Sequence, residues 1–222
     1  MDIKEWNKNL KYLKEIIFKE EKFEESRNIM LMLHAMVHSS DISEINLKTF
    51  EDELWENFDE RVFRNNVQKK GRTVLYGMWH SSRIEDITMN ILVAGEKQII
   101  SQNNFYEKIN SGITDTGNSL SENEIMELSR SININYLREY RDKVGLKTEE
   151  IIKNFNYKDL KKKILPERLE KVLEEKAVLE TENSVWLIDF WERKNVAGIV
   201  LMPALRHNLV HINESLEAKK RS

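Results

Sequence analysis

Four long segments of this chain repeat apolar residues with the period of an α-helix, about 3.6 residues. These segments are residues 12–39, 73–94, 132–155 and 196–218. Few other stretches alternate apolar and polar residues as a half-buried strand does. The pattern therefore predicts an all-α fold: an antiparallel four-helix bundle with additional short helices in its long connections.

The sequence shows no internal repeat, low-complexity tract or Gly/Pro-rich linker that would divide it. Its 222 residues are 40% apolar, which is enough to form a substantial core. We therefore predict one helical bundle domain spanning residues 1–222.

Local signals predict several helix ends. Thr49 with Asp52, and Ser121 with Glu124, have the spacing of a capping box at a helix N-terminus. Gly95 is a typical helix stop. Four further predictions concern whole segments: a continuous helix over 10–39, a helical 132–155 with a break near Gly145, a short helix over 185–191, and a polar linker over 60–72.

The composition limits the chemistry. The sequence has no cysteine, which excludes disulfides, thiolate ligands and a cysteine nucleophile. A net charge of −3 provides no overall attraction to nucleic acid or anionic membrane. The N-terminus has no signal-peptide core, and the longest apolar run, Val196–Leu205, is half the length of a membrane span. We therefore expect a soluble, cytoplasmic protein with no nucleic-acid or membrane partner.

Histidines provide the main chemical signal. His207 and His211 are spaced four residues apart in the last segment, so both imidazoles leave one face of a helix. His80 lies on the apolar face of the second segment, and Pro203 predicts a kink that could orient the pair. Three imidazoles would leave coordination positions for water or substrate, so these histidines are candidate metal ligands. The alternative is that each is a core or surface histidine with an ordinary hydrogen-bond partner.

Several sharper motifs are absent from the sequence. His207 is not followed by the glutamate of the HExxH metalloproteases, and no histidine follows a glutamate by three residues as in di-iron bundles. The phosphate-binding glycine loops and the nucleophile elbow are also missing. A mononuclear metal site remains.

The segment Trp79–Asp86, WHSSRIED, followed by Arg206–His211, RHNLVH, resembles the DinB/YfiT-like superfamily. The resemblance implies a four-helix bundle in which one histidine of the second helix and an HxxxH pair of the last helix bind a divalent metal, most often nickel or zinc. It also implies a link to transferases and isomerases that use low-molecular-weight thiols such as mycothiol or bacillithiol. The chain departs from compact members by its long interval between these two helices and by the additional pair His34 and His38.

The first functional hypothesis is a metal-dependent transferase or hydrolase that acts on a small molecule through a metal-activated water or thiol. Candidate catalytic residues are His38, as a fourth ligand or acid/base group, Glu214, which could orient an imidazole, and Arg83, which could pair with an anionic substrate. Ordinary packing of His34 and His38 is the alternative, as is a salt bridge of Arg83 to Glu51, Asp52 or Glu85. If the pair contributes, we expect His38 to lie nearer the metal than His34.

The second hypothesis is a non-catalytic stress or protein-interaction bundle with a structural or vestigial metal site. Residues 96–198 would then provide its partner surface. An open coordination position favours the enzyme and a filled tetrahedral site favours the structural role. The sequence leaves the oligomeric state open, with a homodimer as one alternative.

Overall fold

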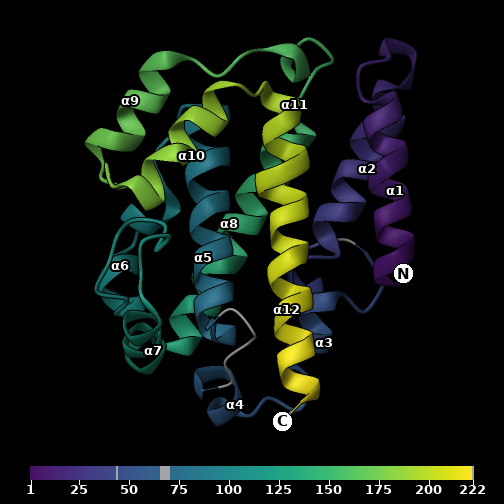
Figure 1. The fold of residues 1–222 in the computed structure, drawn as a ribbon. Coiled ribbons are helices and arrows are strands. Elements are labelled where there is room, and N and C mark those ends of the chain that lie inside the picture. The colour runs from purple at the N-terminus through teal and green to yellow at the C-terminus, as the bar shows by residue number, and fades with distance from the viewer. Residues whose placement is uncertain (44, 66–70, 222) are drawn as a thin grey trace.

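The computed structural model describes residues 1–43, 45–65 and 71–221. Within these ranges the chain is helical and contains no strand, only an isolated bridge between Lys163 and Asn195. The prediction of an all-α protein is confirmed (Figure 1). The elements are α1 (Ile3–Ile16), η1 (Glu20–Lys22), α2 (Phe23–Ala35), η2 (Ser40–Ile42), α3 (Phe50–Trp55), α4 (Glu60–Asn65), α5 (Val74–Asp86), η3 (Ile87–Ala94), η4 (Ile99–Ser101), α6 (Phe105–Ile109), α7 (Glu122–Ser131), α8 (Ile134–Lys153), η5 (Asp159–Lys161), α9 (Pro166–Glu174), α10 (Glu182–Glu192), α11 (Val196–Ile199), η6 (Val200–His207) and α12 (Asn208–Lys220).

The first long segment forms a helical hairpin. α1 ends at Ile16, and after η1 the chain returns as α2 alongside α1. Leu13 and Leu33 are fully buried, and the Trp6 indole donates a hydrogen bond of 2.9 Å to the Leu33 carbonyl across the pair. The prediction of one helix over 10–39 is wrong because a straight helix would hold these apolar faces apart, whereas the hairpin buries them against each other.

α5 runs through the centre of the molecule (Figure 1). Every residue from Val74 to Asp86 is buried, and α5 contacts both α8 and α12. α2 in turn contacts α8 and η6. α2, α8, α5 and the last helix therefore pack in a closed ring around a common core.

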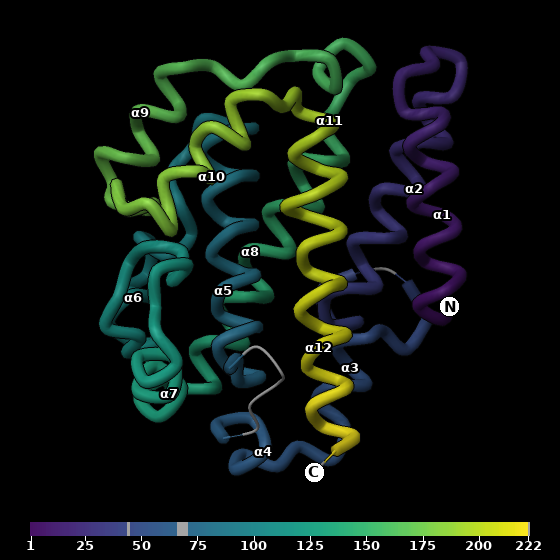
Figure 2. Tube along the Cα trace, viewed as in Figure 1, coloured from purple at the N-terminus to yellow at the C-terminus, as the bar shows by residue number. Residues whose placement is uncertain are grey.

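The last helix is one continuous rod made of α11, η6 and α12 (Figure 2). Asn195 caps its start by accepting a hydrogen bond from the Gly198 amide at 2.9 Å. η6 is a π-helix that contains Pro203. Proline lacks the N–H that the carbonyl of Ile199 would need, and a π-helical segment is one way a helix absorbs such a loss.

Several local predictions are confirmed. Thr49 and Ser121 form the capping boxes that begin α3 and α7, and Gly95 ends η3 in the left-handed conformation with φ 74°. The predicted short helix over 185–191 lies inside α10. These signals are local hydrogen-bonding patterns, which explains why they could be recognised without tertiary information.

α8 is continuous through Gly145, so the predicted break there is wrong. The glycine provides space instead: a Cβ at this position would lie 2.5 Å from Ile42 Cδ1 and 2.8 Å from His38 Nδ1. Gly145 therefore permits the segment after α2 to approach α8 closely.

The predicted polar linker over 60–72 begins with a helix, α4, and its residues 66–70 lie outside the described ranges. No helix in the described part of the chain is long and apolar enough to cross a membrane.

Candidate metal centre

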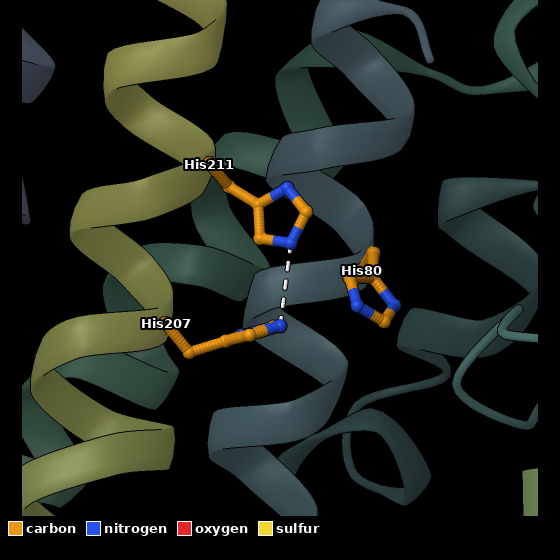
Figure 3. A group of neighbouring side chains, drawn as sticks. All are labelled: His80, His207 and His211. Carbon is orange, nitrogen blue, oxygen red and sulfur yellow. Dashed lines mark hydrogen bonds between the residues drawn. The ribbon is translucent and has the colours of Figure 1, made fainter. Parts of the chain in front are cut away.

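His80, His207 and His211 converge in the structure, as Figure 3 shows. One potential ligand atom from each lies within 4.8 Å of the others. The Nε2 atoms of His207 and His211 are 3.2 Å apart, and the His80 ring centroid is 5.0 Å from each of the other two. We call this group the three-histidine cluster. Its formation requires α5 and the last helix to be neighbours, which they are.

The connection between α5 and α8 orients the His80 ring. His80 Nδ1 donates a hydrogen bond of 2.6 Å to the Thr116 carbonyl. Because a carbonyl only accepts, Nδ1 carries the proton and Nε2 keeps its lone pair. Gly117 allows the loop to lie against α5, since a Cβ there would come within 2.7 Å of Trp79. A metal-binding histidine commonly donates its second nitrogen to a carbonyl in this way.

The three rings are neutral near physiological pH. Burial lowers the pKa of His80 from its ordinary 6.5 to about 4. Burial also lowers the pKa of His207 and His211 well below the ordinary value, and repulsion from the neighbouring imidazoles lowers it further. Neutral imidazoles retain the lone pairs that a transition metal requires.

Glu214 lies beside the cluster on α12. Its Oε2 is 3.5 Å from His211 Nδ1 and 3.8 Å from an Arg72 nitrogen. The carboxylate therefore lies where it can orient the His211 ring, as the sequence suggested. His207 Nδ1 makes no hydrogen bond within the described residues, so the protein does not fix the tautomer of this ring.

A pocket of about 660 Å³ opens over the cluster. All three histidines line it, together with Arg72, Tyr76 and Glu214. α10 supplies an apolar and aromatic wall, made of Trp186, Leu187, Phe190 and Trp191. Trp186 remains 48% exposed, so a large aromatic surface is available. The sequence did not predict that this wall belongs to the site, because the period of α10 indicates only that one face is apolar.

His38 belongs to a different group. Its Nε2 lies 3.0 Å from Glu85 Oε2, and His34 Nε2 lies 2.8 Å from Glu85 Oε1. We call these residues the His34–His38–Glu85 cluster, which is fully buried. The structure therefore groups His38 with a carboxylate rather than with His80, His207 and His211. From the sequence, Glu85 was expected only as a partner for Arg83, because nothing local to Glu85 indicates the distant histidines.

Arg83 lies inside the protein at 1% exposure. It donates to Asp86 at 3.2 Å, to the Tyr140 hydroxyl at 3.0 Å and to the Thr114 carbonyl at 2.7 Å. Its carboxylate partner is therefore Asp86, which was not among the three predicted partners. Arg83 does not line the pocket over the three-histidine cluster. The structure thus provides no route by which Arg83 could pair with a substrate there.

No protein-family model matches this chain, and no curated protein has a significant sequence match to it.

Proposed function

We propose that this protein is a divalent-metal-dependent enzyme in which His80, His207 and His211 hold the metal. The observation that supports the proposal is the convergence of three neutral imidazoles within 4.8 Å on the wall of a pocket. In the metal-free protein, a proton on one ring disfavours a proton on its neighbours, because the positive charges would repel each other. The facing nitrogens of His207 and His211 can share one proton at most. A cation relieves both problems.

The donor set fits nickel or zinc. Both ions accept imidazole nitrogen, and zinc enzymes commonly use three protein ligands with an open position. In the described part of the chain, the group contains three histidines and no fourth histidine or carboxylate. This supports the catalytic hypothesis over a filled structural site.

The pocket suggests how a small molecule would bind. The apolar part of the molecule would lie against Trp186 and Phe190. An anionic group on the same molecule would reach Arg72, which also lines the pocket. A bound divalent cation lowers the pKa of a coordinated water or thiol and so provides a nucleophile at neutral pH. Glu214 would hold the His211 ring in position while it interacts with Arg72. The reaction we propose is hydrolysis of a small molecule by the activated water, or transfer of a low-molecular-weight thiol to it, with the displaced leaving group taking up the proton that the nucleophile lost.

We further propose that the ring of α2, α8, α5 and the last helix is a four-helix bundle of the DinB/YfiT-like type. The supporting observations are the contacts around the ring and the origin of the ligands, one from α5 and two from the last helix. In this proposal the remaining α-helices are additions around the bundle: α1, α3, α4, α6, α7, α9 and α10. α10 then serves to complete the pocket.

Elemental analysis of untagged protein purified without chelator tests the metal site. His207→Ala and His211→Ala should each lose one equivalent of metal relative to the wild type, because two remaining protein ligands seldom hold a divalent ion. Asn213→Ala, a change on the same helix outside the cluster, is the matched control and should keep the wild-type content. Circular dichroism should show the same helix content for all variants. Equal metal content in every variant would refute the proposal.

Substitution with Co²⁺ tests the open position. Addition of a low-molecular-weight thiol should produce a sulfur-to-cobalt charge-transfer band in the wild type and none in His211→Ala. A cobalt spectrum that no thiol, azide or other small anion changes would indicate a closed site. The non-catalytic alternative would then be the better explanation.

A further inference from the structure

The His34–His38–Glu85 cluster joins two helices at the centre of the protein. His34 lies in the last turn of α2, His38 lies just beyond its end, and Glu85 lies on α5. Each carboxylate oxygen faces one imidazole, at 2.8 Å and 3.0 Å, and the two rings are 4.4 Å apart. One potential ligand atom from each residue lies within 4.8 Å of the others.

The charge of Glu85 lacks an arginine or lysine partner among the described ion pairs. The two buried guanidinium groups nearby each have a carboxylate of their own: Arg141 pairs with Glu51 at 2.6 Å and Arg83 with Asp86. Among the residues that the structure describes, the imidazoles and the amide of Asn208, at 2.7 Å, are the groups that hydrogen-bond the Glu85 carboxylate. A buried carboxylate is costly unless a cation compensates it.

Two imidazole nitrogens and a carboxylate oxygen are the His₂Glu ligand set of many zinc proteins. Ligand atoms at about 2.0–2.2 Å from a tetrahedral ion lie roughly 3.3–3.6 Å apart. The observed nitrogen–oxygen distances of 2.8 Å and 3.0 Å would therefore open by roughly half an ångström on ion binding. This shift would fall on His38, which lies beyond the end of α2 with its ring against Gly145.

The cluster does not belong to the pocket over the three-histidine cluster. None of its three residues lines that pocket, and their exposure does not exceed 2%. A cation enclosed in this way would link α2 to α5 across the core. Asn208 would connect the enclosed cation to the three-histidine cluster, since it follows His207 in the chain and donates a hydrogen bond to Glu85. Its side-chain oxygen accepts a hydrogen bond from Arg141 at 3.2 Å.

We propose that His34, His38 and Glu85 form a second metal site for a divalent transition ion such as Zn²⁺. It has three protein ligands like the first site, but it is buried and does not line the pocket, so its role is structural. The ion neutralises Glu85 and fastens the end of α2 to the central helix. It enters during folding, because the finished structure encloses the cluster. This site does not depend on the proposed catalytic activity.

The test counts metal in protein that is unfolded with chelator, freed of chelator and refolded with Zn²⁺. Two double variants form a matched pair: His34→Gln with His38→Gln, and His207→Gln with His211→Gln. Glutamine can still donate a hydrogen bond to a carboxylate but is a poor zinc ligand. We expect two equivalents of zinc in the wild type and one in each double variant. Chelator should remove the ion of the enclosed site at least tenfold more slowly.

The outcomes separate this inference from the proposed function. One equivalent in the wild type that is lost in the His207/His211 variant and kept in the His34/His38 variant would overturn the second site. The reverse pattern would support the second site and contradict the proposed catalytic one. Wild type without zinc would overturn both. If the His34/His38 variant does not fold, the His207/His211 variant decides: one equivalent supports the second site and none overturns it.

Discussion

The protein contains two histidine clusters that share the helical core but differ in what faces the imidazoles. In the three-histidine cluster the rings face one another and a pocket. In the His34–His38–Glu85 cluster the rings face a carboxylate and lie away from that pocket. The first arrangement offers lone pairs to a ligand from outside, whereas in the second the Nε2 atom of each imidazole already has a Glu85 carboxylate oxygen as its partner.

The electrostatic consequences differ, although burial also lowers the pKa of His38 against the opposing effect of Glu85. Burial lowers the pKa of the three pocket histidines, so the metal-free cluster opposes folding in acid. In the other cluster the imidazoles lower the pKa of the Glu85 carboxyl well below its usual range, against the effect of burial, so the ionised carboxylate is stabilised where it lies. The comparison suggests that one cluster contributes to chemistry and the other to the stability of the fold.

Removal of Glu85 should produce the largest loss of stability. In chelator-treated protein, Glu85→Ala leaves His34, His38 and Asn208 without their acceptor and should lower the unfolding free energy by about 3–5 kcal/mol. His211→Ala should lower it by about 1 kcal/mol, because it removes a hydrogen bond between two neutral imidazoles, that of His211 Nε2 with His207 Nε2. Urea unfolding followed by circular dichroism measures both. Equal losses would show that the clusters do not differ in this respect.

The pH dependence of stability should distinguish the clusters next. Folded His80 has a pKa of about 4, whereas in the unfolded chain it titrates near its ordinary value of about 6.5. The unfolded chain therefore binds the proton first, and the unfolding free energy falls as the pH decreases from about 6.5 to about 4, by up to ~1.4 kcal/mol per pH unit for this group.

Urea unfolding at stepwise pH measures this dependence. Over this pH range the unfolding free energy of metal-free His80→Gln should fall less steeply with decreasing pH than that of the metal-free wild type. The contribution of Glu85 is distinct: its lowered pKa confers stability that is present above the unfolded value of about 4.3 and is lost only as the pH falls below it. Identical slopes for wild type and His80→Gln would contradict the assignment of this acid sensitivity to His80.

Two glycines should give the smallest effects, and these should have opposite signs. A Cβ at Gly145 would meet His38 Nδ1 at 2.8 Å, so Gly145→Ala should cost about 1–3 kcal/mol. A Cβ at Gly77 would meet His211 Nδ1 at 3.5 Å, an ordinary contact, so Gly77→Ala should gain about 0.5–1 kcal/mol as a helix-interior substitution. Thermal unfolding of the two variants checks this pair. A change of the same sign in both would contradict the predicted difference in packing between the two sites.

The sequence by itself determined the helical class and several helix ends, because both depend on local properties. An apolar period reports which face of a segment is buried, and the capping residues Thr49 and Ser121 act on amides three positions away. The spacing of His207 and His211 and the buried face of His80 likewise indicated which imidazoles could meet.

Only the tertiary structure decided the partners of the remaining groups. Glu85 is 51 positions from His34 and 47 from His38, and no local pattern relates them. The same holds for Gly145, which provides space for His38, and for α10, whose Trp186 completes the pocket wall. Periodicity identifies a buried face, but the identity of the side chain opposite that face depends on how separate helices pack, and that is a property of the whole chain.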